Sequence, residues 1–277
     1  MRGHPPLRPR WLHADVAPAR AGARARATVA VVNDGSATWH SRGDRGLQLS
    51  YHWLDPLGNP IVWDGPRTPL PRPVAPGQTL ELDLDLRVPR PPGAYRLRFD
   101  LVEELHFWLE EIGCDVLDVP VRVEPRIAGR RLAVRVAGGP HPATDAALAA
   151  QSEPVTLQLE GADAVAHLVA GAIPPPDWAT RMLDAHAEGH PAVGPAVRTR
   201  SRALSKQLEP WRAGGRNPRF TLPLLLPSLV AGLKPGEHLS LPAYAGEDRL
   251  FEGGLVVELD SRARSSTPPQ RSGRRPR

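Results

Sequence analysis

The sequence predicts a β-sandwich over residues 10–124, a smaller α/β domain over residues 130–260, and a disordered basic tail over residues 261–277. Three observations predict this arrangement. Apolar and polar residues alternate through several short segments of the first half, which is the pattern of half-buried strands. Strand-like and helix-like segments alternate in the second half, which is typical of an α/β layer. The final residues are polar and carry no apolar periodicity.

Strands of the first domain are marked by this alternation. In residues 80–88 the apolar side chains alternate with acidic and basic ones, which predicts one core face and one wet face. Turn sequences rich in Gly, Pro and Asn separate the strands, as expected for an antiparallel sandwich. Pro120 has the opposite parity to its apolar neighbours, which indicates an edge strand. The other segments with strand patterning are residues 29–31, 47–53, 95–101 and 117–123.

The second domain alternates between two kinds of element. Trp178, Met182 and Ala185 recur at helical spacing, and Gly189 with Pro191 predicts the end of that helix. Residues 164–170 are apolar apart from His167, as expected for a buried strand. We expect strands over 130–137, 164–170, 192–197 and 255–259, and helices over 141–151 and 177–188.

A resemblance to a known module adds to this interpretation of the first domain. The residues that carry it are Trp53-Leu54-Asp55, Arg67 to Pro71, Pro76-Gly77, Pro92 to Leu97, Asp100 to Glu104 and Phe107-Trp108. This segment resembles an immunoglobulin-like module of bacterial sugar-modifying enzymes, chiefly glycosyltransferases. It is similar, more loosely, to the carbohydrate-binding sandwich of O-antigen exporter ATPases. The resemblance implies an immunoglobulin-like fold and a link to glycans.

Carbohydrate binding is therefore one hypothesis for the first domain. Aromatic rings stack on sugar rings, and carboxylates accept hydrogen bonds from sugar hydroxyls. Trp108, with Glu104 beside it, is the candidate ligand-binding group, and Trp39 and Trp63 also lie near turns or strand ends. The alternative is that these tryptophans fill the core and the acids face water, which is the commoner fate of tryptophan in a sandwich.

The second domain resembles the family 2 glycosyltransferases, which have a GT-A fold. Residues 132–151 and 167–183 are similar to the first strand and helix of that family and to its metal-site strand and following helix. The family's strand ends in an acid pair that holds a divalent metal against the nucleotide diphosphate. Here the matching stretch is Leu168 to Ala172, which contains no acid. We therefore expect a reduced domain without a metal or other cofactor.

Two remaining groups are weaker candidates for chemistry. Asp248 follows Glu247, and the family's general base often lies in such a pair; a plain loop acid is the alternative. Arg212, Arg216 and Arg219 surround a Gly-Gly turn and would suit a phosphate group, but also an ordinary surface loop. His186 and His190 have a metal-ligand spacing, yet Gly189 is expected to end the helix between them.

The charge of the chain is concentrated at its end. Six arginines and no acid lie in residues 261–277, and without them the formal charge falls from +5 to −1. We therefore expect no nucleic-acid partner apart from weak contacts of the tail. Cys114 is the only cysteine, so no intrachain disulfide forms, and no apolar run suits a leader or a membrane span. A cytoplasmic protein is expected.

Three functions follow from these observations. The first is a non-catalytic accessory or binding protein of bacterial glycan or cell-envelope polysaccharide metabolism, with a carbohydrate or a glycan-pathway protein as its partner. The second is an active glycosyltransferase with a reduced, metal-independent site. The third is a protein–protein interaction scaffold. The missing acid pair favours the first over the second, and nothing in the sequence separates the first from the third.

Overall fold

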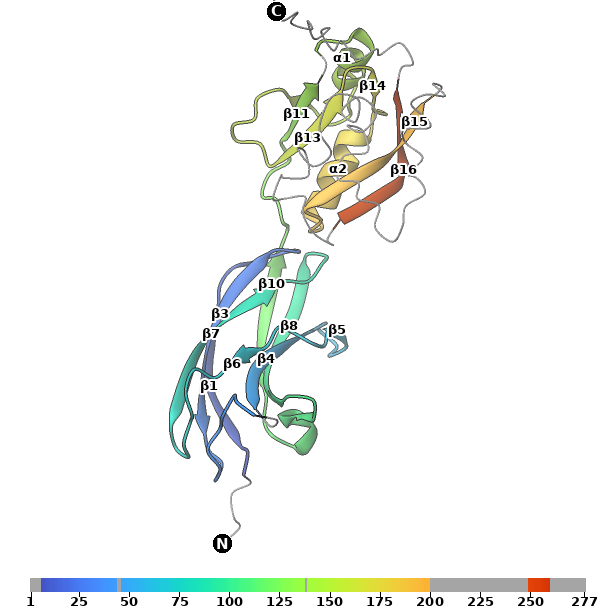
Figure 1. Cartoon of the computed structure of the whole chain (residues 1–277). Coiled ribbons are helices and arrows are strands. Elements are labelled where there is room, and N and C mark those ends of the chain that lie inside the picture. The colour runs from blue at the N-terminus through green and yellow to red at the C-terminus, as the bar shows by residue number, and fades with distance from the viewer. Residues whose placement is uncertain (1–5, 44–45, 138, 200–248, 260–277) are drawn as a thin grey trace, which may run out of the picture. The chain divides into compact units, whose positions relative to one another are not determined.

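The computed structural model describes residues 6–43, 46–137, 139–199 and 249–259. It is rich in β-strands and contains few helices, which confirms the prediction of a β-rich protein. The chain divides into two compact units, residues 1–126 and residues 127–277 (Figure 1). The basic tail over residues 261–277 lies outside the described residues.

The first unit contains two sheets. A three-stranded antiparallel sheet has the order β1-β3-β7, with bounds Pro9–Val16, Arg24–Asn33 and Thr79–Arg87. The second sheet has the order β2-β10-β8-β4-β5, with bounds Ala19–Arg20, Leu117–Glu124, Gly93–Glu103, Leu47–Leu54 and Pro60–Val62. Two short strands join it, β6 (Thr68–Pro69) beside β4 and β9 (Phe107–Trp108) beside β8, and the 3-10 helix η1 (Leu109–Ile112) follows β9.

One hydrophobic core contains residues of both sheets. On β7 every second residue from Leu80 to Leu86 is buried, and the residues between are exposed, as the alternation predicts. Tyr51, Phe99, Trp39 and Trp53 are large aromatic side chains of this core, and all four are fully buried. The backbone N–H of Arg87 donates to the Tyr51 hydroxyl at 2.7 Å, so a hydrogen bond also links β7 to β4.

Strand β1 is the one long strand of the first unit that alternation does not reveal, and the short strands β2, β5, β6 and β9 are not predicted either. Its pairing with β3 shifts register between Trp11 and His13, and Leu12 in the shift is 45% exposed. Trp11, Ala14 and Val16 pack against the core, so their spacing is interrupted and the period-2 signal is lost. The Trp11 indole also donates to the Asp115 carbonyl at 2.7 Å, which ties β1 to the segment before β10.

The second unit combines parallel strands with two helices. Strands β12 (Val155–Thr156), β11 (Leu132–Ala137) and β13 (Ala164–Val169) form one parallel sheet. Helix α1 (Pro142–Ala149) follows β11, and α2 (Trp178–Ala187) precedes β15 (Ala192–Thr199). Strand β16 (Arg249–Leu259) pairs with β15 in parallel and with β14 (Ala172–Ile173) in antiparallel fashion. Trp178, Met182 and Leu183 of α2 lie in the core of this unit.

The first unit should fold without the second. Among the residues that the structure describes, its core draws only on those before Arg126. The Arg126 guanidinium donates to the Gly22 carbonyl at 2.7 Å, so the last residue of the unit is held as well. We expect a fragment of residues 1–126 to melt in one cooperative transition, measured by circular dichroism. A fragment that melts without cooperativity would show that the first unit needs residues beyond Arg126.

Candidate functional site

The outer face of the seven-stranded sheet is not a simple solvated face. On β4 the side chains of Leu49, Tyr51 and Trp53 enter the core, so Ser50 and His52 belong to the opposite face. Both are fully buried. The segment after β4 provides part of the cover, because the Ser50 hydroxyl donates to the Gly65 carbonyl at 2.9 Å. The outer face therefore holds a buried polar layer.

His52 lies at the centre of an aromatic group. Its Nδ1 contacts the Trp63 carbonyl oxygen, and since a carbonyl only accepts, Nδ1 carries the proton. Burial lowers the pKa of His52, so the ring is neutral at pH 7. The Nε2 atom is therefore a lone-pair acceptor, and within the described part of the chain no donor reaches it.

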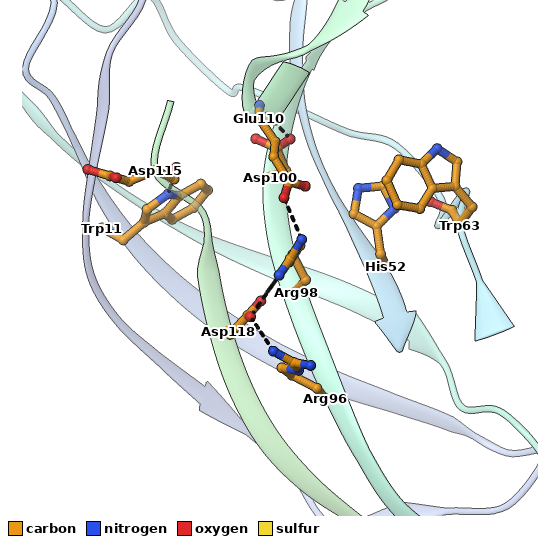
Figure 2. Close-up of polar contacts among 9 residues, drawn as sticks. All are labelled: Trp11, His52, Trp63, Arg96, Arg98, Asp100, Glu110, Asp115 and Asp118. Carbon is orange, nitrogen blue, oxygen red and sulfur yellow. Dashed lines mark hydrogen bonds and ion pairs between the residues drawn. The ribbon is translucent and has the colours of Figure 1, made fainter. Parts of the chain in front are cut away.

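Trp63 stacks on His52 and remains open to solvent. The two ring centroids are 4.1 Å apart with planes inclined by 22°, and Trp63 is 44% exposed (Figure 2). Trp108 contacts the same imidazole edge-on, with centroids 4.2 Å apart, but it is only 8% exposed. The Trp63 ring is thus a flat apolar surface that packs on the buried His52 ring.

Arg67 connects this aromatic group to two carboxylates. Its guanidinium carbon lies 4.7 Å from the centroid of the Trp108 ring, a cation–π contact. The same group donates to Glu104 at 3.0 Å and pairs with Asp64 at 2.6 Å. Trp108 and Glu104, both predicted from the sequence as ligand-binding residues, therefore meet at Arg67.

A second ion-pair group lies farther along the same face. Arg98 of β8 binds both oxygens of Asp118 on β10, at 2.7 and 2.9 Å, and also pairs with Glu110 of η1 (Figure 2). Arg96 reaches Asp118 at 3.4 Å. These hydrogen bonds raise the pKa of Arg98 and lower the pKa of Asp118, so both groups are charged at pH 7.

Asp100 is a buried carboxyl within this layer. It is fully buried and accepts the backbone N–H groups of Leu101 at 2.7 Å and Glu110 at 3.1 Å. Burial raises the pKa of Asp100 to about 7, against these two hydrogen bonds, which lower it. The Glu110 carboxylate raises this pKa further and Arg98 lowers it. The carboxyl is therefore partly protonated at neutral pH.

Two of the predicted site residues, Trp108 and Glu104, lie in the described part of the chain. Trp108 presents little surface to a ligand because Arg67 and His52 cover it, and Trp63 takes the exposed position instead. The sequence alternation puts His52 and Ser50 on the outer face but does not reveal their burial, so neither is predicted as a site residue. Asp248, Arg212, Arg216 and Arg219 lie outside the described residues.

In the second unit, β13 is the strand that the sequence comparison matched to the metal-site strand of the glycosyltransferases. The stretch Leu168 to Ala172 includes the last two residues of this strand and the three that follow, and it carries no acid. Arg130 pairs with Glu153 through two 2.7 Å hydrogen bonds and with Asp184 at 2.9 Å. In the described ranges no cluster of three or more metal-ligating side chains occurs. His186 Nδ1 contacts the His190 carbonyl rather than its ring.

Comparisons with known proteins give likenesses in structure alone. No family model matches the chain, and no curated protein matches it. A CARDB domain from Pyrococcus furiosus, solved in complex with di-metal ions, is similar at 18% identity and a TM-score of 0.28, covering 44% of this chain and 96% of that one. The C-terminal domain of wzt matches at 12% identity and a TM-score of 0.23, covering 43% of this chain and 77% of that one.

A third likeness is to a larger enzyme. A family 123 glycoside hydrolase from Clostridium perfringens matches at 11% identity and a TM-score of 0.24. The match covers 43% of this chain and 25% of the hydrolase. No family is assigned to the chain by these comparisons.

Among the described residues, neither α-helix has the length and apolar character that crossing a membrane requires.

Proposed function

We propose that the first unit is an immunoglobulin-like carbohydrate-binding module, and that the chain is a non-catalytic binding protein of glycan metabolism. The exposed ring of Trp63, stacked on the buried His52, carries this proposal. The apolar C–H face of a sugar ring packs on such an indole, while its hydroxyls need polar partners at the rim. Asp64 and Glu104 supply acceptors there, and the guanidinium of Arg67 supplies donors.

The rigid support of Trp63 favours binding over simple core filling. A tryptophan that served only the core would turn its ring inward, as Trp39 and Trp53 do with no exposed surface. Trp63 instead keeps almost half of its surface in water, although the Trp63 carbonyl and the His52 ring fix its position. The Trp63 ring is one large apolar surface with a small number of polar groups beside it. Small-molecule sites in general are lined in these proportions.

The test is a glycan array followed by calorimetric titration with the best oligosaccharide. We expect Trp63→Ala to weaken the affinity at least tenfold, which corresponds to about 1.4 kcal/mol. Ile61→Ala is the matched control, because Ile61 is a similarly exposed apolar residue of the same segment, and it should bind as the unchanged protein does. An unchanged protein that binds no glycan, or a Trp63→Ala variant that binds equally well, would refute the proposal.

A further inference from the structure

The three guanidinium groups described above on the outer face of the seven-stranded sheet are each engaged by carboxylates. Arg67 lies between Asp64 and Glu104, Arg98 lies between Glu110 and Asp118, and Arg96 shares Asp118. An acidic sugar at Trp63 would have to displace one of these carboxylates from its cation. Breaking a partly buried ion pair in this way is costly because it leaves a carboxylate without its partner.

The charge balance next to Trp63 is negative. Arg67 provides one positive charge against the two carboxylates that contact it, so this group has a net charge of about −1. His52 adds no positive charge, since burial lowers its pKa. The Asp64 side chain is 68% exposed, whereas the Arg67 side chain is 23% exposed, so the negative end of the pair faces solvent.

Asp64 follows Trp63 directly in the sequence, and its carboxylate acts electrostatically on His52, the ring on which Trp63 stacks, so it lies near the stacking surface. A ligand that stacks on the indole with a protonated amine at the ring edge would meet Asp64 without displacing Arg67. Cation–π attraction to the Trp63 ring acts in the same direction. Both effects select for positive charge on the ligand.

We infer that the Trp63 surface selects saccharides that carry a free, protonated amine over their N-acetylated and acidic counterparts. This inference rests on the proposed carbohydrate-binding function and specifies its ligand class. Asp64 is the specificity-determining residue, and Trp63 provides the stacking surface common to all three sugar types.

The experiment compares three oligosaccharides of equal length: glucosamine, N-acetylglucosamine and galacturonic acid oligomers. Titrations run at about pH 5.5 and low salt, where the carboxylate of galacturonic acid and the amine of glucosamine are both charged. We expect the glucosamine oligomer to bind about two- to fivefold more tightly than the N-acetylated one, and the acidic oligomer to bind weakest. Added salt should reduce the difference between the first two.

Two variants separate this inference from the function on which it rests. Asp64→Asn should remove most of the preference for the amine while retaining affinity for N-acetylglucosamine oligomers. Glu81→Gln is the matched control, because it removes one exposed carboxylate from the other sheet and should keep the preference. Equal affinity for all three oligomers, with binding still lost in Trp63→Ala, would overturn the selectivity but not the function. Binding unaffected by Trp63→Ala would overturn both.

Discussion

Leu84→Asp should lower the free energy of unfolding of the first unit by about 4 kcal/mol or more, because it removes a buried side chain and leaves an unpaired carboxylate in the core. Leu84 is 1% exposed and belongs to the hydrophobic core of the first unit. The measurement is urea denaturation of the fragment of residues 1–126, followed by tryptophan fluorescence. A loss this large brings a domain of this size close to complete unfolding.

Thr79→Asp is the matched control for this substitution. It places the same carboxylate on the same strand, but at an exposed position. Its effect should stay within about 0.5 kcal/mol. If Leu84→Asp were as harmless as Thr79→Asp, the apolar face of β7 would not be the core face.

Asp100 should make the first unit less stable as the pH rises. Its pKa is about 7 in the folded state, whereas an unperturbed aspartate has a pKa of 3.8, so between these values the folded state holds a proton that the unfolded state has lost. Stability contributed by this proton is present in full below about pH 4 and is lost as the pH rises to about 7. The difference amounts to about 4 kcal/mol across that range.

Asp100→Asn removes this titration, so its stability should decline less than that of the unchanged fragment between pH 4 and pH 7. The comparison isolates Asp100, because the other titrating groups, His52 among them, are present in both proteins. Burial lowers the pKa of His52, so the stability that His52 contributes is lost as the pH falls, which is the opposite direction. Asp85→Asn, which removes a carboxyl that is 74% exposed, should keep the pH dependence. Parallel curves for Asp100→Asn and the unchanged fragment would show that Asp100 is ionised throughout.

Much of the fold is predictable because β-strand alternation is a local signal. The core face of β7 can be assigned from the sequence, and so can that of β8, since Leu97 and Phe99 are buried there as their parity predicts. Strand β1 cannot, because the register shift at Leu12 interrupts the period. In the second unit, Trp178 and Met182 are buried together, as their helical spacing indicates.

The candidate site is less predictable because it depends on contacts between distant segments. Alternation places His52 and Asp100 on the outer face, where a polar residue is expected to meet water. Their burial depends on where the segments around Trp63 and Glu110 lie, and hydrogen bonds to the sheet determine this. The acidic neighbours of Trp108 favour it as a ligand-binding residue. Sequence proximity does not show that Trp108 is covered by other side chains while Trp63 stays exposed.

The attachment of the Trp63 segment to β4 also affects the entropy of binding. The Ser50 hydroxyl and the Arg67 guanidinium both donate to the Gly65 carbonyl, and the Gly65 N–H donates to the Tyr51 carbonyl at 3.1 Å. A Cβ atom at Gly65 would lie 2.6 Å from the Tyr51 carbonyl oxygen, so this close approach requires glycine. The indole is thus already ordered before any ligand arrives, and association need not include the cost of immobilising it, about 0.5–1.5 kcal/mol for a free side chain.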